Sequence, residues 1–321
     1  WRCKGTSSLL LVVTGQYQAS QPCSLSSKVD VPVVKFCLLL SRDTYTHLTL
    51  PDLRKESQVD RDRQRQTRSK IYTHTYTHNT KGYTGVAGYS THSIMFGGST
   101  GADPMYSNNT YIYSFETNKM VHQPTTGDVP NPRSAHSAIC YNDHMYIFGG
   151  WDGKESNNDT YKLNLKTFQW RKMLNSNPPL KRRAHCCVLY NKAQYLFGGF
   201  DTAYAPETFN TIHKFCFKKE KWTTVTCDGE IPKGRSRASM VQFENKFYMI
   251  GGWDRKNYFH EIYEFNIESF HWKKMMHNIN QVNLGLGQNS VLVHANRMFV
   301  FAGYQPKKNS STNELFMSRL S

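Results

Sequence analysis

The sequence predicts an all-β protein built as a propeller of repeated four-stranded blades. The first observation is a pair of glycines that closes a short apolar run and recurs along the chain. Its copies are Gly97-Gly98, Gly149-Gly150, Gly198-Gly199 and Gly251-Gly252, with Ala302-Gly303 as an altered fifth copy. The second observation is the spacing, because successive copies stand 49 to 53 residues apart. A period near fifty residues is typical of propellers and solenoids.

Each repeat also contains four short runs of strand-forming residues. The second copy shows them in order: Ser137–Asn142, His144–Phe148, Thr160–Leu165 and Gln169–Arg171. These runs are rich in Val, Ile, Tyr and Phe, which fit a pleated, half-buried surface. Tyr161, Leu163 and Leu165 alternate with polar residues, as on a strand with one buried face. No window of this region keeps an apolar stripe at helical spacing, so we expect no helices.

The glycines and a tryptophan at the end of each repeat have mechanical roles. Where inner strands converge on an axis, a side chain has no room and a bend can require positive φ, and glycine meets both demands. Trp170, Trp222 and Trp272 follow one another at intervals of 52 and 50 residues. Since a tryptophan buries about 150–250 Å², we expect each one to fill the gap between two blades. The first repeat has the smaller Met120 at this position.

The repeats divide the chain into residues 1–81 and a propeller over residues 82–321. We place the five repeats at 82–131, 132–180, 181–233, 234–283 and 284–321, the last one incomplete. Residues 1–81 lack the repeat, and we expect an irregular or disordered basic segment. Its run Ile71–Thr80 alternates Thr, His and Tyr as a simple nucleotide repeat would encode, which favours a gene-model artefact.

These features together resemble the kelch repeat: the glycine pair, a Tyr or Phe in the third strand and a Trp in the fourth. The resemblance covers residues 82–321. The motif Pro132-Arg133-Ser134-Ala135-His136, echoed by Arg182-Arg183-Ala184-His185, is similar to the intracellular kelch-domain and leucine-zipper-like regulator branch. The resemblance implies a propeller of four-stranded blades that binds proteins.

Closed kelch rings usually have six or seven blades, whereas five repeats are visible here. Either residues 1–80 donate strands or the chain is a fragment, and we expect the fragment. The apolar run Leu9–Gly15 ends in glycine, as the second strand of each repeat does, and an alternative interpretation is that it is a remnant of another blade.

The residue after the glycine pair is aromatic in four of the five copies. These residues are Trp151, Phe200, Trp253 and Tyr304. In kelch proteins this position lines the opening that binds the partner, and large aromatic side chains are frequent interface anchors. The alternative is that all four pack against a neighbouring blade.

Arginines recur where the chain leads into each blade. They are Arg133, Arg182-Arg183, Arg235 and Arg237. Beside aromatic rings, guanidinium groups bind acidic side chains through bidentate hydrogen bonds. The alternative is a structural bond to a loop carbonyl, or to Asp152 or Asp254.

The net charge and the cysteine content indicate which partners and which cellular compartment to expect. The net charge of +16 favours acidic partners, but no nucleic-acid reader motif is present, so nucleic acid is not expected. None of the eight cysteines forms a C-x-x-C pair, which favours a reducing, cytoplasmic location. No apolar run approaches the length of a membrane span.

We therefore expect a non-catalytic scaffold or adaptor that binds an acidic peptide of a protein partner on the loop face. No catalytic motif is present in its required context, and we expect no metal and no cofactor. Two alternatives stay open. One is a secreted metal-dependent oxidase on the same fold, and the other is a polyanion binder that acts through its basic charge.

Overall fold

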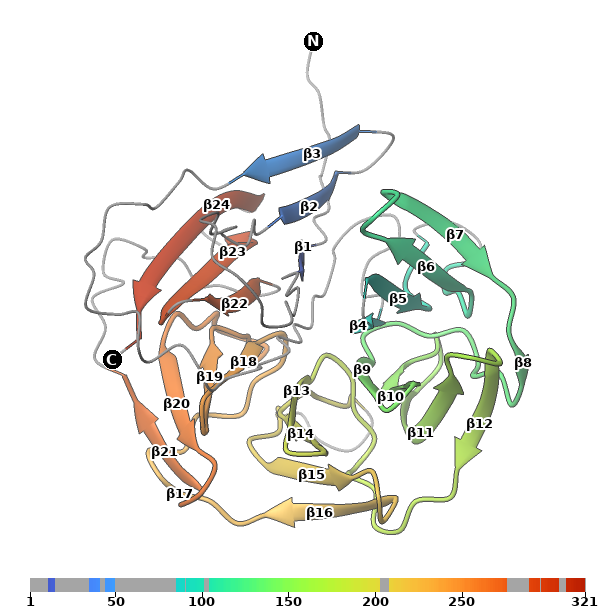
Figure 1. The fold of residues 1–321 in the computed structure, drawn as a ribbon. Coiled ribbons are helices and arrows are strands. Elements are labelled where there is room, and N and C mark those ends of the chain that lie inside the picture. Colours follow the sequence, from blue (N-terminus) through green and yellow to red (C-terminus); the bar gives the residue numbers. More distant parts are fainter. Residues whose placement is uncertain are drawn as a thin grey trace, which may run out of the picture.

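In the computed structural model, the described strands form six sheets arranged around a central axis (Figure 1). The structure describes residues 11–14, 35–40, 44–49, 85–89, 91–100, 104–202, 208–275, 289–294, 296–305 and 310–320. Every regular element within these ranges is a strand. The prediction of an all-β propeller of four-stranded repeats is confirmed.

Four sheets are complete antiparallel blades, ordered from the axis outward. The first has β4 (Gly85–Tyr89), β5 (His92–Phe96), β6 (Thr110–Ser114) and β7 (Lys119–Gln123). The second has β9 (Ser137–Tyr141), β10 (His144–Trp151), β11 (Ser156–Asn164) and β12 (Gln169–Met173). The third has β13 (Cys186–Tyr190), β14 (Ala193–Phe197), β15 (Ile212–Cys216) and β16 (Lys221–Val225). The fourth has β18 (Ser239–Phe243), β19 (Lys246–Ile250), β20 (Ile262–Asn266) and β21 (His271–Lys274).

Two further sheets have three strands each. The fifth blade consists of β22 (Ser290–His294), β23 (Arg297–Gln305) and β24 (Ser310–Arg319). The sixth sheet consists of β1 (Leu11–Thr14), β2 (Lys35–Leu40) and β3 (Thr44–Thr49). Figure 1 shows the sixth sheet in the ring between the fifth and first blades.

The sixth sheet lies within residues 1–81, the segment that we expected to be irregular or disordered, and that expectation stays a prediction. Its first strand, β1, falls within the apolar run Leu9–Gly15, which we had considered as a blade remnant. The rest of residues 1–81, including Ile71–Thr80, lies outside the described residues. The boundary at residue 82 stays a prediction.

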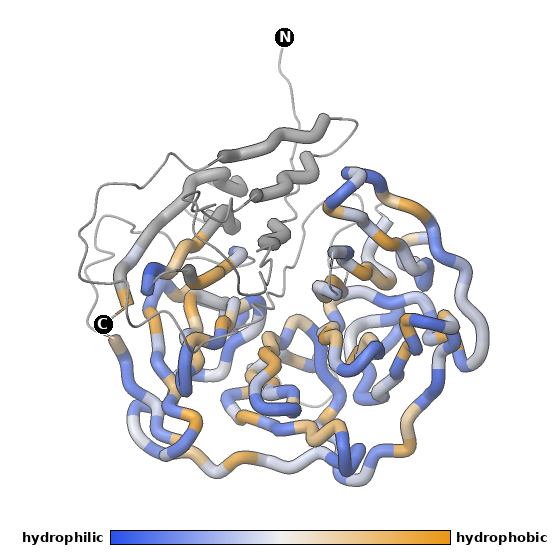
Figure 2. The backbone as a smooth tube through the Cα atoms, in the orientation of Figure 1, coloured by the Kyte–Doolittle hydropathy of each residue, from blue (hydrophilic) through white to orange (hydrophobic). Residues whose placement is uncertain are grey.

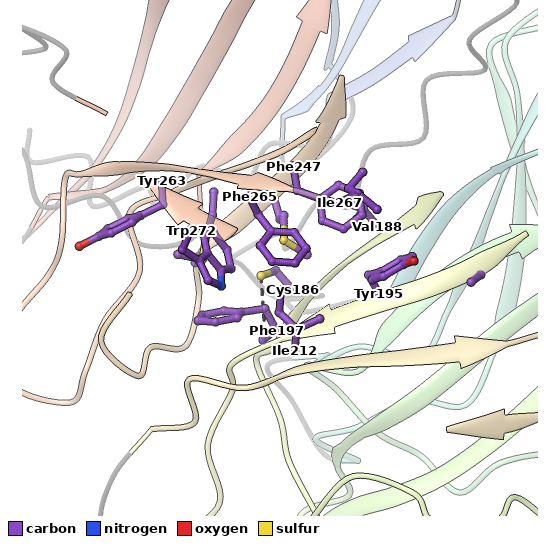
Figure 3. Close-up of a cluster of buried hydrophobic side chains, with 14 residues drawn as sticks. Cys186, Val188, Tyr195, Phe197, Ile212, Phe247, Tyr263, Phe265, Ile267 and Trp272 are labelled. Carbon is purple, nitrogen blue, oxygen red and sulfur yellow. Dashed lines mark hydrogen bonds between the residues drawn. The ribbon is translucent and has the colours of Figure 1, made fainter. Parts of the chain in front are cut away.

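Neighbouring blades share apolar cores, and hydrophobic and hydrophilic stretches alternate along the strands (Figure 2). The three tryptophans lie in these cores and are at most 1% exposed. Each packs against a phenylalanine of the preceding blade, with ring centroids 4.7 to 5.4 Å apart. Figure 3 shows the core between the third and fourth blades, where Trp272 lies beside Phe197 and Phe265. Met120, in contrast, is 40% exposed.

The glycine pair is required where one blade meets the next. Gly149 and Gly150 both have positive φ, at 65° and 97°. A Cβ on Gly149 would lie 2.7 Å from the carbonyl oxygen of Arg182, and one on Gly150 would lie 2.7 Å from that of Ser134. The N–H of Gly150 donates to the Arg182 carbonyl at 2.9 Å. The backbone at the blade junction therefore leaves no room for a side chain.

Replacing Gly150 by alanine should destabilise the propeller. The variant places a Cβ 2.7 Å from a carbonyl oxygen and forces a non-glycine residue to positive φ, so the free energy of unfolding should fall by at least about 1–3 kcal/mol. Urea unfolding followed by tryptophan fluorescence measures this change. Gly88→Ala is the matched control, because a Cβ there meets nothing within 4 Å. Equal losses in the two variants would contradict the role given to the junction.

Candidate functional site

The loops after the glycine pairs lie on the same face as the segments that lead into the blades. Backbone bridges join these two regions within each blade: Ser134 to Trp151, Arg183 to Phe200, and Ser236 to Trp253. In the second blade, both N–H groups of the bridge donate, at 2.8 and 2.9 Å. The aromatic residue after each glycine pair is thereby fixed beside the start of its own blade.

A second set of backbone bonds links the blade starts around the axis. Ala135, Ala184 and Arg237 occupy the same register in three successive blades, and all have positive φ between 54° and 57°. The N–H of Ala184 donates to the carbonyl of Ala135, and the N–H of Arg237 donates to that of Ala184, both at 2.8 Å. Arg237 therefore stands in the inner ring at a position where the two preceding blades have alanine.

Arginine and aromatic side chains stack on this face. The Arg183 guanidinium carbon lies 3.8 Å from the ring centroid of Trp151 and 4.6 Å from that of Phe200. The corresponding carbon of Arg237 lies 4.8 Å from the centroid of Trp253. Such cation–π contacts hold a guanidinium in one orientation. We call the set Trp151, Arg183, Phe200, Arg237, Trp253 and Arg255 the mouth.

The mouth has a positive charge balance. Arg255 is exposed, and its guanidinium carbon lies 5.9 Å from the Phe200 ring centroid. Burial lowers the pKa of Arg183, and the nearby charges of Arg237 and Arg255 lower it further, while that of Asp201 raises it. Asp201 itself is only 2% exposed. Three guanidinium groups thus lie in this region with the buried carboxylate of Asp201, while the carboxylates of Asp152 and Asp254 lie in the adjoining loops.

The aspartates that follow Trp151 and Trp253 support their own loops. Asp152 accepts hydrogen bonds from the N–H groups of Lys154 and Glu155 at 2.9 and 2.8 Å. Asp254 accepts the equivalent bonds from Lys256 and Asn257. These bonds fix the loops that present the mouth tryptophans.

A family model described as the KLHDC2/KLHL20/DRC7 Kelch-repeats domain matches residues 82–303, more than half of the chain. The chain belongs to the kelch-repeat family. Human Kelch domain-containing protein 3 is 28% identical over 179 residues, which cover 52% of this chain and 47% of that protein. Kelch domain-containing protein 10 of Xenopus laevis is 23% identical over 193 residues, covering 57% and 47%. Leucine-zipper-like transcriptional regulator 1 of Pongo abelii is 30% identical over 192 residues, covering 57% and 22%. The chain spans about half the length of human Kelch domain-containing protein 3. It spans a smaller part, 22%, of leucine-zipper-like transcriptional regulator 1.

The structure corrects the expected role of three kelch-repeat arginines. Arg133, Arg182 and Arg235 are each 1% exposed, so their side chains cannot reach a partner. Each Nη1 donates to the carbonyl oxygen of the first glycine of its own blade at 3.0 Å. These are the structural bonds to loop carbonyls that we had set beside the binding role. Of the predicted arginines, Arg183 and Arg237 lie in the mouth.

The buried arginines differ in how their charge is compensated. Arg133 forms an ion pair with Asp159 at 2.6 Å, and Arg235 lies 3.9 Å from Glu261. Within the described residues no carboxylate pairs with Arg182, whose Nη2 lies 3.4 Å from Nε2 of His213. Burial lowers the pKa of Arg182 to about 9. Burial and the charge of Arg182 lower the pKa of His213 to about 4.

The predicted aromatic residues divide into two groups. Trp151 and Trp253 are half-buried and present ring faces to arginine. Phe200 is 8% exposed and packs against Ala184 at the start of its own blade and Ala135 at the start of the preceding blade. The side chain of Tyr304 lies outside the described part of the chain, although its backbone pairs with Ser311 in the fifth blade.

Arg183 was noted beside Arg182 at the blade entry, whereas Arg255 was not among the predicted site residues. Arg183 stands where the second and fourth blades have Ser134 and Ser236, and this break in the repeat was the available signal. Arg255 lies in a loop that no repeat pattern marks. Only the fold brings it near Phe200 of the neighbouring blade.

No group of three His, Cys, Asp or Glu side chains suited to a metal occurs among the described residues. In the same part of the chain, no helix is long and apolar enough to cross a membrane. Cys140 and Cys186 are reduced, and burial raises the pKa of each thiol to about 12. These thiols act as small apolar side chains.

His136 makes the blade junction sensitive to acid. Burial and the charge of Arg133 lower its pKa to about 3, against about 6.5 in an unfolded chain. Between these values the unfolded state binds more protons than the folded state, so stability is present above pH 6.5 and decreases as the pH falls toward 3. His136→Ala introduces the residue that the fourth blade has at this position, Ala238. It should reduce the slope of the free energy of unfolding against pH by up to about 1.4 kcal/mol per pH unit.

Urea unfolding at several pH values between 7 and 4 tests this expectation. His122→Ala is the control, because that side chain is exposed on the outer strand of the first blade. The same pH slope in the wild type and in His136→Ala would show that acid acts elsewhere.

Proposed function

We propose that this kelch propeller is a non-catalytic scaffold or adaptor whose mouth binds an acidic segment of a protein partner. The observation that carries the proposal is the stacking of Arg183 between Trp151 and Phe200, next to Arg237 and Arg255. The kelch-domain relatives support a protein-interaction role in general terms. The acidic character of the partner rests on the mouth alone.

Rigid guanidinium groups suit this task. Stacking between two rings leaves the edge of the Arg183 guanidinium as its hydrogen-bonding side, and this edge fits the two oxygens of a carboxylate. Because the group is already held in place, little conformational entropy is lost on binding. Its partial burial also strengthens its attraction for an anion relative to a fully hydrated side chain.

The tryptophans add apolar contact beside the charges. Trp253 stacks on Tyr258 with ring centroids 5.8 Å apart, so the loop that carries it is braced from within. Braced aromatic residues and arginines are the side chains that most often dominate binding energy at protein interfaces. We propose that the segment bound here combines carboxylates with an apolar side chain.

We further propose that the protein acts in the cytoplasm. Reduced, buried cysteines in the inner strands, such as Cys140 and Cys186, support a reducing compartment.

Peptide binding measured by fluorescence anisotropy tests the mouth. The probe is a labelled nonapeptide with four Asp or Glu residues and two leucines, and its counterpart replaces each acid by its amide. The acidic peptide should bind at least about tenfold more tightly, a difference of about 1.4 kcal/mol. Arg237→Ala should weaken binding of the acidic peptide by about tenfold. The protein should tolerate this change, since alanine already occupies the same register and positive φ at Ala135 and Ala184.

Lys273→Ala is the matched control, because it removes the same charge from the exposed outer strand β21. Equal effects of Lys273→Ala and Arg237→Ala would indicate binding through net charge. That result, or equal affinity for the acidic and amide peptides, would refute the proposed site.

A further inference from the structure

Short connector segments cover the outer edges of three blades. In the second blade, β8 (Thr126–Gly127) pairs in parallel with Gln169 and Trp170 of β12. In the fourth, β17 (Asp228–Gly229) pairs in the same way with His271 and Trp272 of β21. In the third, Ser176 forms a parallel bridge with Lys221. Each connector precedes the blade that it covers, so the arrangement is a repeated part of the fold.

These segments share a local conformation. Gly127, Asn177 and Gly229 follow the first paired residue and have positive φ of 79°, 53° and 80°. A Cβ on Gly127 or Gly229 would lie 2.3 Å from the carbonyl oxygen of Trp170 or Trp272. Pairing with the outer strand therefore requires a residue that tolerates positive φ at this position of the connector, and glycine meets this requirement best.

An acidic residue completes two of the three segments. The N–H of Asp128 donates to the Trp170 carbonyl at 3.0 Å, and its carboxylate accepts from the N–H of Lys172 at 3.0 Å. Glu230 repeats both bonds in the fourth blade, at 2.8 and 2.9 Å. We call the sequence Thr/Asp-Gly-Asp/Glu, seen at Thr126–Asp128 and Asp228–Glu230, the edge clip.

The first blade has the same edge without a clip. Met120 pairs with Tyr113 in the register in which Trp170 pairs with Leu163, so β7 corresponds to β12. Within the described residues, β7 is the terminal strand of its sheet. Met120 and Val121 are 40% and 54% exposed. By the same register, the carbonyl of Met120 and the N–H of His122 point outward, where a clip would bond them.

The sequence at the repeat spacing has no clip for this edge. In the second and fourth blades the clip stands 43 positions before the residue that it pairs with. The same step back from Lys119 gives Tyr76-Thr77-His78, which contains neither a glycine nor a carboxylate.

We propose that the outer edge of β7 binds an extended segment of a partner protein with the sequence Thr/Asp-Gly-Asp/Glu. The segment adds as a short parallel strand, a recognised mode of peptide binding at sheet edges. The residue that precedes the glycine of the segment pairs with Lys119. The carboxylate of its Asp or Glu accepts a hydrogen bond from the N–H of His122. The exposed ammonium of Lys119 complements the acid. This site is separate from the mouth and does not depend on it.

A peptide taken from the protein's own clip is the probe. The octapeptide Gln-Pro-Thr-Thr-Gly-Asp-Val-Pro reproduces residues 123–130. In an NMR titration it should bind saturably and shift the amide signals of β7. Replacing its glycine by valine should weaken binding by at least about tenfold, because the bound conformation needs positive φ. Replacing its aspartate by asparagine should weaken binding to a smaller degree.

Two protein variants locate the site. His122→Pro removes the outward N–H, and proline is accepted on edge strands whose N–H faces solvent. It should reduce octapeptide affinity severalfold, whereas Arg237→Ala in the mouth should leave it unchanged. The proposal fails if the octapeptide does not bind saturably, if the valine peptide binds equally well, or if Arg237→Ala abolishes binding. The peptide comparison uses the unchanged protein, so it decides the matter even where His122→Pro does not fold.

Discussion

A buried arginine at each of three successive blade junctions is the interaction on which the rest of the described structure depends. In the third blade, the carbonyl of Arg182 accepts the N–H of Gly150 from the preceding blade at 2.9 Å, while its Nη1 donates to the carbonyl of Gly198 in its own blade at 3.0 Å. One residue therefore bonds two blades. Burying a guanidinium is unfavourable unless such partners are in place. The buried arginine therefore depends on the glycine pairs of both blades for its hydrogen bonds. The glycines in turn are needed because the arginine holds the backbones of the two blades close together.

The junction also determines what the loop face can present. The residue after each buried arginine bridges to the aromatic residue of its own blade, and the next residue joins the ring of backbone bonds around the axis. Because these two positions are fixed in space, their side chains can differ from blade to blade. The second blade has the small residues Ser134 and Ala135, whereas Arg183 and Arg237 bring charge to the third and fourth. In the mouth, equivalent backbone positions of successive blades therefore carry side chains of different charge.

The sequence was sufficient for the repeated features and insufficient for contacts between repeats. The glycine pairs, the strands and the interblade tryptophans recur at one register, so their period predicted the propeller. A recurring arginine fits either a surface or a junction, and only the fold shows that Arg133 is buried while Arg237 is not. The approach of Arg255 to Phe200 joins two blades and leaves no local pattern. The strands β1–β3 lack the glycine pair, and only the apolar run Leu9–Gly15, which contains β1, suggested a further blade there.

The central claim is that Arg182 forms a structural bond between blades, whereas the side chain of its neighbour Arg183, which we propose to bind a partner, does not. Urea unfolding of Arg182→Ala and Arg183→Ala tests this claim most directly, because the two changes are chemically identical and adjacent. Removing Arg182 leaves the buried Gly198 carbonyl without its donor, so the free energy of unfolding should fall by about 1–3 kcal/mol, while Arg183→Ala should remain close to the wild type. Wild-type stability in Arg182→Ala, with the loss seen only in Arg183→Ala, would contradict the account.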